Sequence, residues 1–266
     1  MLEAALFGAI AQSALIMGAL LAWKFPALKK PLVVGALMAF GAGAIMSAVS
    51  IDLVAVSYDE AGAGPTAIGV GIGALLYFGI IALLERRSHE ETPGEVLTAE
   101  VSAPAAGGHG AQLEVHGASK KEARNLTIGM VIDGVPESIA VGLTLHTATA
   151  GVSAALVGSI FISAVPEAIG ISAALLAGGI AMASILLRFS AVVVIGAVFA
   201  AVGYTLLSNA SDSTQAIIQS VAAGALLVVV INEMIPIAVR SVKGWAGIIG
   251  TAGFVFSAAL TWATGG

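Results

Sequence analysis

The chain of 266 residues has no cysteine, which excludes disulfide bonds and thiolate metal ligands. Charge is scarce as well: 10% of the residues are charged, whereas soluble domains average about 25%. Hydrophobic residues make up 58% of the chain, and the mean hydropathy is +1.02. The apolar runs are continuous, so the alternating segments of a membrane β-barrel are missing too. These features exclude a soluble globular protein and predict an all-α polytopic membrane protein.

The apolar runs predict eight transmembrane helices, because a span takes about 20 apolar residues. We place them at residues 2–23, 31–51, 66–84, 125–145, 151–177, 189–208, 215–239 and 245–262. The whole chain, 1–266, is then a single transmembrane domain. Residues 85–124 are rich in Glu, Ala, Gly and His and have little apolar content, which predicts a flexible loop.

The basic residues predict the orientation. All 11 Lys and Arg fall on one side of the predicted spans: Lys24, Lys29, Lys30, Arg86, Arg87, Lys120, Lys121, Arg124, Arg188, Arg240 and Lys243. The positive-inside rule makes this side, with the loop 85–124, cytoplasmic and both termini extracytoplasmic. We expect a multi-pass protein of the plasma (inner) membrane whose partner is the lipid bilayer and not nucleic acid.

Two segments of the chain resemble each other. Residues 42–52 align with residues 223–233, each beginning Ala-Gly-Ala and ending in an acidic residue. The predicted spans that contain them cross the membrane in opposite directions. Similar segments in opposed orientations indicate an inverted repeat, which in transporters has its binding site at the repeat interface.

Two Val-Pro-Glu motifs, at residues 135–137 and 165–167, lie deep in predicted spans. An ionisable group near the bilayer centre costs about 2.5 kcal/mol or more, so it usually has a partner or a function. A proline also removes one backbone donor and leaves the carbonyl one turn earlier without it. The motifs therefore predict two interrupted helices with an ion site at the interruptions.

Three carboxylates belong to this predicted site. Asp133 and Glu137 are four residues apart and share one helix face, and Glu167 follows the second proline. Together they would form an oxygen-rich metal site, because a cation balances their charge in a low dielectric. The alternative is that each carboxyl group is protonated or hydrogen-bonded to a serine such as Ser138 or Ser163.

Other polar residues are weaker candidates. Asp52 and Glu233 lie near the ends of predicted spans, where they either cap a helix end or lie in the headgroup region, or act as vestibule carboxylates that attract cations. Ser163 and Asn232 are further candidates for the pathway. The loop histidines His89, His109 and His116 are either a metal-binding tract or incidental.

Residues 125–143, 161–173 and 231–236 resemble spans four, five and seven of the Zrt/Irt-like (ZIP) divalent-metal transporters. The resemblance implies eight spans, outward termini, a cytoplasmic metal-handling loop and a binuclear centre between spans four and five. The chain departs from the family motifs where His-Asn becomes Asp133-Gly134 and where the leading His of span five becomes Ser163. The sixth span also lacks an acidic residue. One metal site is thus retained, with Asp133 in place of His.

These observations favour a ZIP-like carrier, not an enzyme, that moves divalent cations toward the cytoplasm around a midplane carboxylate site. Zinc, iron or manganese is the expected substrate, and a homodimer is a candidate assembly. Replacing imidazole by carboxylate shifts the preference toward harder ions. Two alternatives remain: an intramembrane hydrolase with Asp133 and Glu137 as acid and base, and a cation-sensing membrane protein.

Overall fold

The computed structural model describes residues 1–90, 120–147, 154–207 and 211–264. All elements in these ranges are helical, which confirms the all-α prediction. The α-helices are α1 (Leu2–Lys24), α2 (Pro31–Ala48), α3 (Val56–Ala61), α4 (Ala63–Glu90), α5 (Lys120–Thr147), α6 (Ala154–Ala177), α7 (Met182–Leu207), α8 (Asp212–Val229), α9 (Ile235–Val242) and α10 (Trp245–Thr264). A short 3₁₀ helix, η1 (Pro26–Lys29), follows α1, and two π-helical segments complete the set, η2 (Val49–Ala55) and η3 (Val230–Met234).

Within the described ranges, seven helical runs are long and apolar enough to cross a membrane. α5 adds a shorter apolar stretch, Gly134–Leu145. Large hydrophobic side chains are exposed on many of these helices; Phe78 on α4 is 59% exposed, for example. Such a surface suits lipid and not water, so the prediction of a multi-pass membrane protein is confirmed.

The π-helical segments join shorter helices into two long runs. α2, η2 and α3 form one run, Pro31–Ala61, which ends before Gly62 at a φ of +79°. The prediction that this span ends at residue 51 was therefore wrong. A π turn keeps the backbone hydrogen-bonded, so the helical run continues past Asp52.

The prediction of interrupted helices at the two prolines was also wrong. α5 continues through Pro136 and α6 through Pro166. Each proline removes only its own backbone donor. In a bilayer a helix remains the arrangement that satisfies the other backbone groups.

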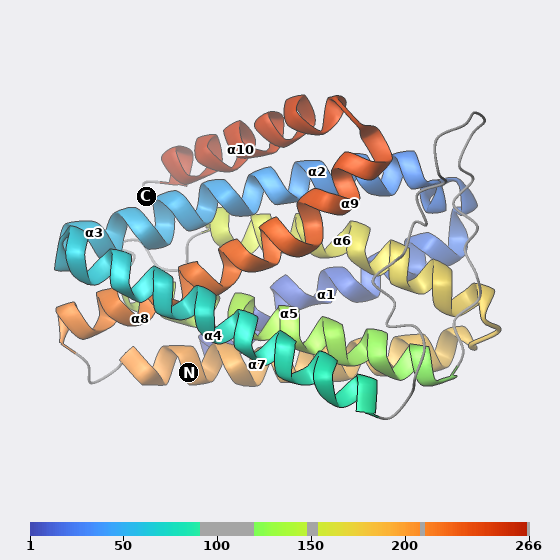
Figure 1. Ribbon diagram of the computed structural model, residues 1–266, viewed down its shortest axis with the longest axis horizontal. Coiled ribbons are helices and arrows are strands. Elements are labelled where there is room, and N and C mark those ends of the chain that lie inside the picture. Colours follow the sequence, from blue (N-terminus) through green and yellow to red (C-terminus); the bar gives the residue numbers. More distant parts are fainter. Residues whose placement is uncertain (91–119, 148–153, 208–210, 265–266) are drawn as a thin grey trace.

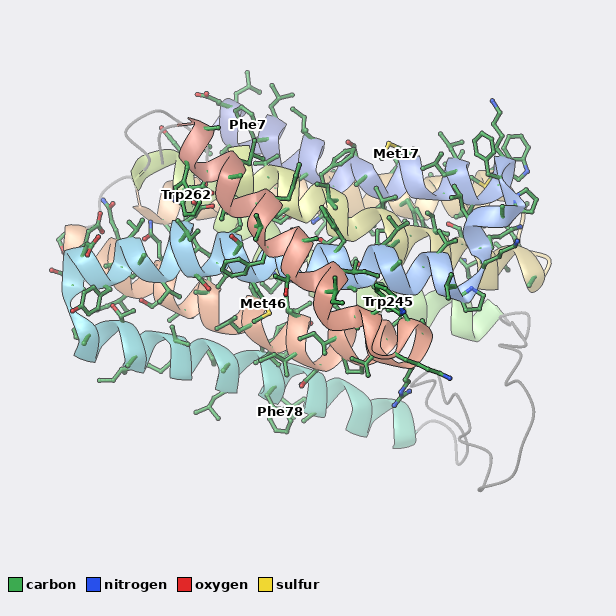
Figure 2. All side chains as sticks on the ribbon, turned by 90° about the horizontal axis from the view of Figure 1, so that it is seen from above. Phe7, Met17, Met46, Phe78, Trp245 and Trp262 are labelled. Atoms are coloured by element: carbon green, nitrogen blue, oxygen red, sulfur yellow. The ribbon has the colours of Figure 1, made fainter. Side chains whose placement is uncertain are left out.

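The helices pack side by side in one bundle (Figure 1). α1 packs along α6 and α7 and also contacts α5, and α5 packs along α7. α2 packs on α6 and α10, and α4 packs on α8. The start of α1 and the end of α10 both lie in the left half of Figure 1, toward the end where α3 lies. Figure 2 shows α10 crossing α2 obliquely, with α1 and α4 at opposite edges and Phe78 pointing away from the bundle.

The ends of the predicted loop 85–124 are helical, because α4 extends to Glu90 and α5 begins at Lys120. The remainder of that loop, 91–119, lies outside the described residues. Its predicted flexibility therefore stays a prediction.

Candidate functional site

Glu137 is a buried carboxylate in the middle of α5, with only 8% of its surface exposed. The side-chain amide of Gln12 reaches it from α1. Gln12 Nε2 donates to Glu137 Oε2 over 3.2 Å and to the Gly134 carbonyl oxygen over 3.5 Å. Gln12 itself is 1% exposed. A buried carboxylate at membrane depth thus has a polar partner from a different helix, as such a group requires.

Two glycines make room for Gln12. A Cβ atom at Gly134 of α5 would lie 3.1 Å from Gln12 Nε2. One at Gly196 of α7 would lie 2.6 Å from Gln12 Cγ and 2.9 Å from Ser138 Oγ. Ser138 is 1% exposed, and its hydroxyl oxygen has no hydrogen-bond partner within the described part of the chain. Glu137, Gln12 and Ser138 therefore form one buried polar cluster where α1, α5 and α7 meet.

The second motif lies on α6. Pro166 is buried and Glu167 is half-buried. Gly18 of α1 packs against this turn: a Cβ atom there would lie 2.7 Å from the Val165 carbonyl oxygen. α1 thus touches both Val-Pro-Glu motifs, through Gln12 and Gly18. These contact points are six residues apart, about 9 Å along the helix axis.

The side chain of Asp133 lies outside the described side chains, although its backbone belongs to α5. Among the side chains that are described, no three His, Cys, Asp or Glu gather closely enough to hold a metal ion. The shared site of Asp133, Glu137 and Glu167 therefore stays a prediction.

A second buried polar cluster surrounds Asp52 in η2. Asp52 is 8% exposed, and Thr261 Oγ1 of α10 shares its donor between Asp52 Oδ1 at 3.4 Å and the Ser257 carbonyl oxygen at 3.3 Å. One turn later Ser57 Oγ donates to Gln219 Oε1 of α8 over 3.5 Å. Asp52 is thus an internal residue of a helical run and not a helix cap. π-helical turns of this kind are frequent at functional sites.

The remaining candidates lie elsewhere. Ser163 is buried, donates to the Ile160 carbonyl oxygen over 2.9 Å, and packs against Gly41 of α2. Asn232 is exposed in η3, and the side chain of its neighbour Glu233 is outside the described set. His89 lies in the last turn of α4 with its side chain outside that set. His109 and His116 lie in the part of the chain that is not described.

The sequence interpretation missed Gln12, Gln219 and Thr261. Gln12 did carry a signal, since a lone glutamine in an apolar span needs a hydrogen-bonding partner. The sequence does not indicate which residue is the partner of Gln12, because Glu137 lies 125 residues further along the chain.

Comparison of the chain with models of known protein families gave no match, and a search among proteins of curated function gave none at the level required for a relationship.

Proposed function

We propose that this protein is a divalent cation transporter of the ZIP type that carries metal ions toward the cytoplasm. The observation that carries the proposal is Glu137, buried in mid-span beside Pro136 and hydrogen-bonded to Gln12. A carboxylate kept at this depth favours a role in binding or moving a cation. The second Pro-Glu pair on α6 supplies a further carboxylate, and α1 contacts both motifs.

The substrate is a divalent metal ion held by oxygen ligands. Glu137, Glu167 and Asp133 supply carboxylates, and each proline removes a donor from the carbonyl one turn earlier. Carboxylate and carbonyl ligands suit magnesium, calcium and manganese, whereas imidazole suits zinc, copper, iron and nickel. Among the zinc, iron and manganese expected from the sequence resemblance, this donor set favours manganese.

An inverted repeat supports alternating access. η2 begins at Val49 and η3 at Val230, which are equivalent positions in the alignment of residues 42–52 with 223–233. The helix before η2 is α2, which packs on α10, and the helix before η3 is α8, which packs on α4. In the proposed repeat α2 corresponds to α8, and α10 corresponds to α4. Two related halves of opposite orientation allow one helix set to rock against the other around a central site. With the basic ends cytoplasmic and both termini extracytoplasmic, this movement takes the metal inward.

Metal uptake into proteoliposomes containing the purified full-length protein tests the proposal. Glu137→Gln and Glu167→Gln keep side-chain size and remove the charge, so uptake of manganese and zinc should fall by roughly tenfold or more. Glu3→Gln is the matched control, because Glu3 is exposed in the first turn of α1. Unchanged uptake by both site variants would refute the proposal, and metal binding without uptake would favour a cation sensor.

A further inference from the structure

We propose that a patch of three lysines, Lys29, Lys30 and Lys243, binds the headgroup of an anionic phospholipid. This lysine patch lies at the basic end of the bundle, where the turn between α1 and α2 meets the turn between α9 and α10. The inference goes beyond the proposed transport function and does not depend on it, because none of these residues belongs to the carboxylate site.

The packing of α2 against α9 brings the two turns together. A Cβ atom at Gly35, in the second turn of α2, would overlap the Cβ atom of Ser241, in the last turn of α9. The start of α2 therefore lies beside the end of α9 (Figure 1). Lys29 and Lys30 directly precede α2, and Lys243 directly follows α9. Lysines far apart in the sequence thus gather at one place on the surface.

The segments that carry the lysine patch contain no carboxylate to balance its charge. The sequence has no Asp or Glu from residue 24 to residue 51, or from residue 234 to residue 266. These two ranges include the whole of η1, α2, α9 and α10. Lys30 and Lys243 are exposed, and Lys29 is half-buried. Clustered basic residues next to a membrane span attract anionic lipid headgroups.

The backbone at Lys243 gives independent support. Its φ is +51°, and among the described residues it is the one non-glycine residue with a positive φ. Glycine adopts such angles at little cost, whereas other residues are strained. Strained residues concentrate at functional sites, so a lysine in this conformation favours a role for its ammonium group. A cation at the end of α9 also stabilises that helix, and a test of the role must therefore measure the response to a ligand.

Exposed apolar side chains beside the lysines indicate that the anion belongs to a lipid. Leu32, in the first turn of α2, and Trp245, at the start of α10, are both 66% exposed. Tryptophan at a span end is typical of the membrane–water boundary, and a lysine there extends its ammonium group toward the headgroups. A phospholipid matches both features, with its phosphate at the lysines and its acyl chains along Leu32 and Trp245. Soluble phosphate would contact only the lysines.

Thermal unfolding of the purified full-length protein in non-ionic detergent tests the site. Phosphatidylglycerol, the anionic probe, should raise the Tm by several degrees more than phosphatidylcholine, the neutral one, because a ligand of the folded state stabilises it. Lys30→Gln and Lys243→Gln should each raise the phosphatidylglycerol concentration needed for the half-maximal shift roughly fivefold. Lys121→Gln is the control, because it removes a lysine from α5, which packs along α7. A parent-like response in either patch variant, or an equal loss in the control, would overturn the proposal.

Two further variants separate the charge of Lys243 from its backbone strain. Lys243→Arg keeps the charge and should keep the response to phosphatidylglycerol. Lys243→Gly removes the charge and relieves the backbone, so it should weaken the response while its Tm in phosphatidylcholine stays at least as high as that of the parent. Loss of the response in Lys243→Arg, or its retention in Lys243→Gly, would show that the charge at this position does not bind lipid.

Two other occupants of the lysine patch give different results. An equal rise in Tm with inorganic phosphate would mean that the patch binds a soluble anion. A response to phosphatidylglycerol that appears only after residues 91–119 are replaced by a Gly-Ser linker would mean that this segment, which contains four glutamates, covers the patch in the parent. Either result would overturn the assignment to lipid.

Discussion

Gly43 and Gly224 occupy equivalent places in two separate helix crossings. A Cβ atom at Gly43 of α2 would overlap the carbonyl oxygen of Gly250 in α10, and one at Gly224 of α8 would overlap that of Val70 in α4. The two glycines are 181 residues apart, which is the offset that aligns residues 42–52 with 223–233. Close backbone contact through small residues is typical of helix pairs in membranes.

The glycines of the partner helices, α10 and α4, also make equivalent contacts in the two crossings. A Cβ atom at Gly253 of α10 would overlap the Phe40 carbonyl oxygen, and one at Gly73 of α4 would overlap that of Val221. The two crossings therefore share the same register from both sides. Chance similarity between glycine-rich segments does not account for this agreement, so the crossings support the proposed inverted repeat.

We predict that Gly43→Ala and Gly224→Ala destabilise the protein to a similar extent. In each crossing the added methyl group meets backbone, which moves only if the helices separate, so the loss should be about 1–3 kcal/mol. Thermal unfolding of the purified protein in detergent measures it. Gly71→Ala on α4 is the control, since a Cβ atom there meets nothing within 4 Å. A large loss in only one of the two variants would contradict the equivalence of the crossings.

We predict that Thr261→Val lowers stability through Asp52. The substitution preserves shape and removes the hydroxyl that is shared between Asp52 Oδ1 and the Ser257 carbonyl oxygen, and loss of a donor to a buried group costs about 1–3 kcal/mol. The same unfolding measurement applies. Thr251→Val on the same helix is the matched control, because Thr251 is exposed and its hydroxyl donates to the Gly247 carbonyl oxygen one turn earlier in α10. Equal stability of the two variants would show that the bond to Asp52 adds nothing.

Composition was sufficient to predict the fold class, because long apolar runs leave few alternatives to membrane helices. Helix ends were predicted less well where polar residues lie inside a helical run. Asp52 was placed at a span end, yet η2 carries the helix on to Ala61. A π turn depends on how α2 packs against its neighbours, and a single sequence contains no direct sign of it.

The sequence predicted those features of the candidate site that depend on spacing along one helix, but not the contacts between helices. The four-residue spacing of Asp133 and Glu137 is visible in the sequence, and so is the position of Glu137 deep in a predicted span. The contact between Gln12 and Glu137 depends on how α1 crosses α5. Helix crossings arise from side-chain packing over the whole bundle, so this partner emerges only with the three-dimensional structure.

We predict that residues 91–119 are dispensable for transport. Their composition has too little apolar surface to offset the entropy of ordering. Replacing them by a Gly-Ser linker of equal length, with α4 intact to Glu90 and α5 from Lys120, should preserve metal uptake. Loss of uptake in correctly inserted protein would instead assign a central role to His109 and His116, and a variant that restores only these histidines would test it.

We predict that Asp133→His raises zinc uptake relative to manganese. The substitution exchanges a hard anionic ligand for a neutral imidazole, so the site becomes one charge less negative. Imidazole bonding offsets part of the lost attraction for zinc and little of it for harder ions. The prediction concerns the ratio of the two ions, because absolute affinity can fall for both. Competition uptake with zinc against manganese measures that ratio.

Asp133→Asn is the control that separates charge from ligand chemistry. It removes the same charge as Asp133→His and offers no imidazole, so it should weaken both ions without the shift toward zinc. A shift of equal size in the two variants would mean that charge alone sets the preference. An unchanged ratio in both would mean that Asp133 does not contact the metal. The site would then consist of Glu137 and Glu167, with Gln12 holding the first of them in place.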